Sequence, residues 1–125
     1  MVNKYILSTV KKEGFDNEEV YGAYKIFFGT LVSGSRLKII NLLRNGKKNV
    51  SEIMAELEMD QTIVSHNLAR LRRCGFVNVE INGKFRTYSL NEKTIKPLMN
   101  LIDTHMASYC IHILRNGKGG NDEKS

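Results

Sequence analysis

The stretch from residue 49 to residue 90 reads NVSEIMAELEMDQTIVSHNLARLRRCGFVNVEINGKFRTYSL and holds the clearest structural signals of the chain. Asn49 and Glu52 have the spacing of a capping box, in which two side chains satisfy free N–H groups at a helix start. Asp60 can cap a second helix over residues 61–74. The pattern predicts two short helices joined by a tight turn.

A β-hairpin is predicted directly after these helices. Gly75 is the residue type that commonly ends a helix, and residues 76–81 and 84–90 alternate enough to form two strands. Asn82-Gly83 between them is a strong signal for a two-residue hairpin turn. Two helices followed by a hairpin over 76–90 form the winged helix-turn-helix arrangement. We therefore expect a mainly α fold with a β-hairpin wing (α+β), and DNA binding is the leading interpretation.

The remaining chain predicts helices on both sides of this unit. Residues 20–32 carry a wide apolar stripe at helical spacing. Residues 93–114 have an apolar spine that steps by three and four, which is typical of helix pairing. The expected organisation is an N-terminal arm or short helix over 1–16, a winged helix-turn-helix domain over 17–114, and a flexible tail over 115–125.

The charge distribution agrees with DNA binding. The chain has 125 residues and a net charge of +6. The segment from Arg36 to Lys96 holds 12 Lys or Arg and 6 Asp or Glu, whereas the rest holds 7 of each. The whole excess of positive charge therefore lies in the segment expected to contact DNA. No apolar run approaches the ~20 residues of a membrane span, and no signal peptide is evident, so we expect a cytoplasmic protein without a membrane partner.

The second helix, over 61–74, separates into two faces on a helical wheel. Val64, Leu68 and Leu71 cluster on the expected buried side, with Ile63 and Cys74 on one flank. Short polar residues and arginines occupy the other side, which suits a helix that enters a major groove. The candidate DNA contacts are Gln61, Thr62, Ser65, His66, Arg70, Arg72 and Arg73 on this helix, with Lys84 and Arg86 on one face of the wing.

Several motifs resemble the ArsR/SmtB family of small winged-helix repressors. They are the Ser-Arg-Leu-Lys-Ile-Ile-Asn-Leu-Leu run over 35–43, Val-Ser-His-Asn-Leu over 64–68, Cys-Gly-Phe-Val over 74–77, Gly-Lys over 83–84 and Tyr-Ser-Leu over 88–90. Gly34 replaces the proline that is usual in the family. The resemblance implies a homodimer held by the first and last helices, which binds an imperfect palindrome as a repressor and releases it upon a signal.

The resemblance also indicates where a metal ion could be sensed. The absence of cysteine from residues 49–57 argues against the cysteine-type site of the family. Asp103 and His105 resemble half of the family's site in the last helix, and His112 could complete it only with altered geometry. A divalent metal is thus possible at these three residues, and no cofactor is certain. A packing role for the histidines and a redox pair of Cys74 and Cys110 are the alternatives.

Two other classes of function are the alternatives to a DNA-binding regulator. A winged-helix module can bind proteins through the same surfaces without reading DNA. An enzyme is disfavoured because no nucleophile–base pair, phosphate loop or paired carboxylates occur at a meaningful spacing.

Overall fold

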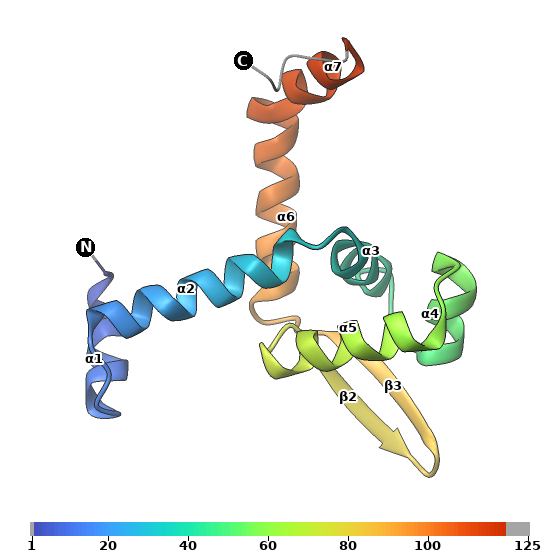
Figure 1. The fold of residues 1–125 in the computed structure, drawn as a ribbon, viewed down its shortest axis with the longest axis horizontal. Helices are drawn as coiled ribbons and strands as arrows, with labels where there is room; N and C mark the ends of the chain where they lie inside the picture. The colour runs from blue at the N-terminus through green and yellow to red at the C-terminus, as the bar shows by residue number, and fades with distance from the viewer. Residues whose placement is uncertain (1, 120–125) are drawn as a thin grey trace.

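The computed structural model describes residues 2–119, and side chains as far as residue 115. A helical core carries a β-hairpin, and two helical arms project from it in different directions (Figure 1). The helices are α1 (Lys4–Lys12), α2 (Asn17–Val32), α3 (Gly34–Leu43), α4 (Val50–Leu57), α5 (Gln61–Arg73), α6 (Ile95–His105), the π-helical turn η1 (Met106–Cys110) and α7 (Ile111–Gly119). The strands are β1 (Lys48–Asn49), β2 (Val77–Asn82) and β3 (Phe85–Leu90).

Side-chain caps begin both helices of the helix-turn-helix, as the sequence predicts. Asn49 Oδ1 accepts a hydrogen bond from the Glu52 N–H at 2.8 Å, and Glu52 Oε1 accepts one from the Asn49 N–H at 2.9 Å. Asp60 Oδ1 accepts from the Ile63 N–H at 2.9 Å. The caps satisfy N–H groups that have no partner within the helix. They therefore fix where α4 and α5 begin.

The hairpin is part of a three-stranded antiparallel sheet in the order β1-β3-β2. Its turn differs by one residue from the predicted Asn82-Gly83, because Asn82 pairs with Phe85 and the central residues are Gly83 and Lys84. Gly83 has a φ of +62°, and glycine at the first central position suits a type II′ turn, which matches the strand twist. Lys84 consequently lies in the turn and not in a strand, so strand alternation does not place it on one face with Arg86.

The core lies among α3, α4, α5, the sheet and the first turns of α6. Val64, Leu68 and Leu71 of α5 are fully buried, which confirms the predicted buried side. Two flanking residues depart from the wheel: Ile63 is 43% exposed, and Asn67 is buried although it is polar. Burial of about a dozen apolar side chains in this cluster supplies the main stabilisation of the unit.

The last helix is longer and less regular than expected. It begins at Ile95 rather than 93, passes through η1 and continues as α7 to Gly119. Helix α7 includes residues 115–119, for which the sequence predicts a flexible tail, and the remaining residues of that tail, 120–125, lie outside the described part. A π-helical turn holds an extra residue in the ladder, so the seven-residue spacing of His105 and His112 no longer places them on one α-helical face.

The two arms are built from α1–α2 and from α6–α7 (Figure 1). α2 and α3 meet at 80°. Of the helices described, none is long and apolar enough by itself to cross a membrane, and only the bent pair α2–α3 reaches that length and composition together.

Candidate nucleic-acid interface

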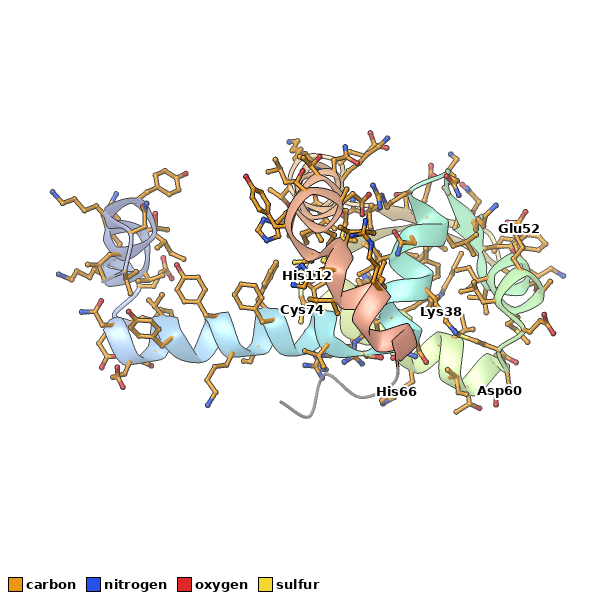
Figure 2. All side chains as sticks on the ribbon, turned by 90° about the horizontal axis from the view of Figure 1, so that it is seen from above. Lys38, Glu52, Asp60, His66, Cys74 and His112 are labelled. Atoms are coloured by element: carbon orange, nitrogen blue, oxygen red, sulfur yellow. The ribbon has the colours of Figure 1, made fainter. Side chains whose placement is uncertain are left out.

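The exposed face of α5 carries six of the nine residues that the sequence predicts as DNA contacts. Gln61, Thr62, Ser65, His66 and Ala69 are exposed along this face, while the core side of the helix is buried. Figure 2 shows His66 projecting outward from α5, and Asp60 at the end of the helix where the chain enters it. The helix therefore presents short polar side chains to solvent over its first two turns.

A hollow separates this face from the wing. It has a volume of about 630 Å³ and lies between the helix and strand β3. Ser65 and Ala69 are small residues in its lining, and the guanidinium-bearing residues Arg72, Arg73 and Arg86 also line it. Its remaining lining residues are Val50, Gln61 and Tyr88.

The three arginines at the hollow are available to an anion. All three are exposed, and within the described part of the chain none of them forms an ion pair with a carboxylate. Arginine binds phosphate oxygens through paired N–H donors. A concave surface with several free guanidinium groups can therefore hold a phosphate backbone against α5.

Arg70 does not belong to this surface. It is half-buried, and its Nε donates a hydrogen bond to Thr30 Oγ1 of α2 at 3.2 Å. Lys84 is exposed at the tip of the wing. The structure thus brings Arg72, Arg73 and Arg86 together, leaves Lys84 at the tip, and directs Arg70 into the protein.

A polar cluster behind α5 was missed by the sequence analysis. Arg36 of α3 donates from Nη1 to Asn67 Oδ1 at 3.2 Å and from Nε to the Thr30 carbonyl at 2.7 Å. The one available signal was Asn67, a polar residue that falls within the apolar arc of the helical wheel. A buried amide is nearly always hydrogen-bonded, so its position predicts a partner without identifying it.

The metal candidates are not assembled into a site. Asp103 Oδ2 accepts a hydrogen bond from Arg44 Nη2 at 2.6 Å and forms an ion pair with it. The His105 ring lies 5.0 Å from the Tyr109 ring. Among the described residues, no group of three or more His, Cys, Asp or Glu could hold a metal ion. Cys74 and Cys110 are both free thiols.

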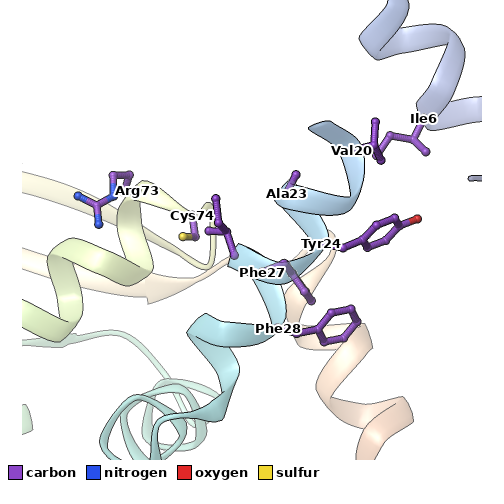
Figure 3. A pocket seen from close by; sticks show the side chains of 9 residues that line it. Ile6, Val20, Ala23, Tyr24, Phe27, Phe28, Arg73 and Cys74 are labelled. Atoms are coloured by element: carbon purple, nitrogen blue, oxygen red, sulfur yellow. The ribbon is translucent and has the colours of Figure 1, made fainter. Parts of the chain in front are cut away.

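The two arms expose large apolar side chains. On α2 these are Tyr21, Tyr24, Ile26, Phe28 and Val32, and on α6, η1 and α7 they are Leu101, Met106, Tyr109, Ile111, Ile113 and Leu114. We call these eleven residues the apolar arm surface. A pocket of about 620 Å³ lies along α2 and reaches Ile6 and Cys74 (Figure 3). Large apolar side chains that stay exposed on projecting helices indicate an interaction surface.

Comparisons with known proteins agree with this geometry. Residues 33–79 match the family model described as bacterial regulatory protein, arsR family. The transcriptional activator HlyU of Vibrio cholerae is 29% identical over 77 residues, covering 62% of this chain and 71% of the relative. An uncharacterized HTH-type transcriptional regulator of Methanocaldococcus jannaschii is 33% identical over 70 residues, covering 55% of this chain and 79% of the relative.

A solved structure extends the likeness to the fold. It is the homodimeric winged helix-turn-helix DNA-binding domain of a possible ArsR-family regulator from Mycobacterium bovis. The TM-score is 0.70 at 24% identity, over 79% of this chain and 94% of that one. The winged helix-turn-helix architecture predicted from the sequence is confirmed.

Proposed function

Because the chain belongs to the arsR family of bacterial regulatory proteins, which are DNA-binding transcription regulators and not enzymes, we propose that it binds an imperfect palindrome as a homodimer and represses transcription. Family membership does not favour the alternative of a protein-interaction module without DNA readout. The observation that carries the proposal is the hollow between α5 and the wing, with its three arginines free of carboxylates.

The residues of this surface divide into two roles. Arg72, Arg73 and Arg86, with Lys84 at the wing tip, contact phosphates and fix the position of the protein on the duplex. The exposed polar side chains on the first turns of α5 contact base edges in the major groove. These are Gln61, Thr62, Ser65 and His66. Arg70 is omitted because its guanidinium is engaged with Thr30.

The apolar arm surface forms the contact between the two copies. Its residues lie on helices that leave the core (Figure 1), and a lone chain would expose their side chains to water. The Mycobacterium bovis domain of the same fold is homodimeric. Two-fold symmetry then presents two α5 helices to two half-sites about one helical turn of DNA apart. Repression follows when the occupied site overlaps a promoter, and such a regulator acts in the cytoplasm.

The proposal is tested by selecting bound fragments from the source genome and measuring their affinity for variants. The triple variant Arg72→Ala, Arg73→Ala, Arg86→Ala is expected to lose both specific and non-specific DNA binding, since phosphate contacts supply most of the sequence-independent affinity. Lys12→Ala is the control for the loss of one positive charge elsewhere, because Lys12 is exposed on α1 away from the hollow. Wild-type affinity in the triple variant would disprove the assignment of the surface.

The direction of regulation needs a second measurement. A reporter gene placed behind the selected fragment is expected to be transcribed less when the protein is present. Increased transcription would make the protein an activator, as its Vibrio cholerae relative is named, and would leave the DNA-binding surface unchanged.

A further inference from the structure

Hydrogen bonds among polar side chains join the end of α2 to α5. Thr30 is fully buried. Its hydroxyl donates to the Ile26 carbonyl at 2.8 Å, and the same oxygen accepts from Arg70 Nε at 3.2 Å. Cys74 Sγ lies 3.4 Å from this oxygen. One threonine on α2 is therefore held by two residues near the end of α5.

Arg36 adds a second connection that includes α3. Its Nε donates to the Thr30 carbonyl at 2.7 Å, its Nη2 to the Gly29 carbonyl at 3.3 Å, and its Nη1 to Asn67 Oδ1 at 3.2 Å. Asn67 is on α5 and is 8% exposed. A single guanidinium thus bridges the last turn of α2 to the buried side of α5.

The position of this cluster has an electrostatic reason. The last four carbonyls of a helix have no partner within it, and the C-terminal end carries partial negative charge. Because α2 stops at Val32 and α3 starts at Gly34, the chain turns sharply and leaves these carbonyls to other donors. Arg36 donates to the Thr30 and Gly29 carbonyls, and Arg70 donates to the Thr30 hydroxyl beside them. Among the described residues neither arginine pairs with a carboxylate.

We propose that Thr30, Arg36, Asn67 and Arg70 act as positioning residues, which fix the orientation of α5 relative to α2 and so set the separation of the two recognition helices in the dimer. This inference rests on the proposed function, since it requires that α2 contacts the second copy and that α5 reads DNA. We call the four residues the α2–α5 lock. None of them needs to contact DNA.

The hydrogen bonds of the α2–α5 lock restrict the orientation of the two helices relative to each other. Apolar contacts tolerate rotation and sliding because the hydrophobic effect is not directional. Hydrogen bonds require donor–acceptor distances near 3 Å and weaken steeply when bent. In the proposed assembly α2 contacts the second copy, so a rotation of α5 against α2 changes the separation of the two recognition helices. Half-sites one helical turn apart demand that this separation be fixed.

The test compares two duplexes with the full-length protein. One is a fragment selected from the genome, and the other has its half-sites moved apart by half a helical turn, about five base pairs. Thr30→Val removes the hydroxyl and keeps the shape of the side chain. It is expected to weaken binding to the selected duplex about tenfold, the loss that follows from a hydrogen bond to a charged group. The affinity of Thr30→Val for the altered duplex should differ from that of the wild-type protein by less than about twofold.

Two variants control the interpretation. Thr30→Ser keeps the hydroxyl and should restore the preference for the selected duplex. Thr104→Val removes an exposed hydroxyl, which, like that of Thr30, donates to the carbonyl four residues earlier, here Asn100 at 3.1 Å within α6, and should leave the preference unchanged. If Thr30→Val fails to fold, Arg70→Lys takes its place, because it keeps the charge at a half-buried site but loses the Nε donor.

The outcomes separate this inference from the function it rests on. A wild-type preference in Thr30→Val or in Arg70→Lys overturns the positioning role. An equal loss on both duplexes, or a similar loss in Thr104→Val, also overturns it, because a general loss of folding or dimerisation would have that effect. If the wild-type protein itself binds neither duplex, the proposed function fails instead.

Discussion

Replacing Arg86 by alanine tests the phosphate-binding role of the wing with little effect on folding. Arg86 is exposed on β3, lies opposite Ile81 of β2 and forms no ion pair within the described part of the chain. Substitutions at such surface positions usually change stability by less than about 0.5 kcal/mol. Any change in DNA binding is therefore attributable to the missing guanidinium.

The size of the effect follows from counterion release. Each phosphate contact contributes about 0.9 to the slope of log K against log salt. A dimer contains Arg86 twice, so the Arg86→Ala slope should be shallower by about 1.8. From about 50 mM to about 200 mM salt, a slope of that size corresponds to about a twelvefold change. The affinity advantage of the wild-type protein should therefore shrink about twelvefold across this range.

Fluorescence anisotropy with a labelled duplex over a series of salt concentrations measures both slopes. The Lys12→Ala control should keep the wild-type slope, because Lys12 lies on α1 away from the hollow between α5 and the wing. A wild-type slope in Arg86→Ala would refute the phosphate contact. A drop of the same size in Lys12→Ala would show that total charge, and not this surface, governs binding.

Three further changes test the core, the wing turn and the arm surface. Leu68→Ala, at a fully buried core position, should lower the free energy of unfolding by about 2–5 kcal/mol in urea titrations at fixed protein concentration; a loss below about 1 kcal/mol would contradict the packing. Gly83→Ala should destabilise by more than about 1 kcal/mol in the same titration, since its φ of +62° strains any side chain, and a stabilised variant would refute the turn geometry. Phe28→Lys should shift the protein from dimer to monomer in sedimentation velocity, because Phe28 is 58% exposed on the apolar arm surface; an unchanged dimer would remove α2 from the contact.

Local chemistry explains which parts of the fold could be predicted from the sequence. The caps at Asn49 and Asp60 act within three residues, and the burial of Leu68 follows from helical periodicity. The hairpin was predicted, but its turn was displaced, because Asn82-Gly83 and Gly83-Lys84 both place a glycine where positive φ is needed. Strand pairing decides between these two registers, and pairing is not a local property.

The remaining differences are tertiary in origin. The helical wheel does not distinguish Arg70 from the exposed arginines of α5, yet its Nε donates a hydrogen bond to the buried Thr30, 40 residues away in the sequence. The hydrogen bond from Arg36 to Asn67 likewise depends on the packing of α3 against α5. The spacing of apolar residues gives no sign of the π-helical turn η1. The sequence therefore predicts one regular last helix, whereas in the structure η1 separates α6 from α7.

The central claim is that a symmetric dimer of this chain reads duplex DNA through two α5 helices. Hydroxyl-radical footprinting on a selected genomic fragment, at a salt concentration where binding is specific, measures this arrangement most directly. We expect two protected half-sites related by a two-fold axis and separated by about one helical turn of roughly 10 base pairs, with protection lost in the triple arginine variant. A single protected segment without symmetry, or protection that survives the triple variant, would contradict the account.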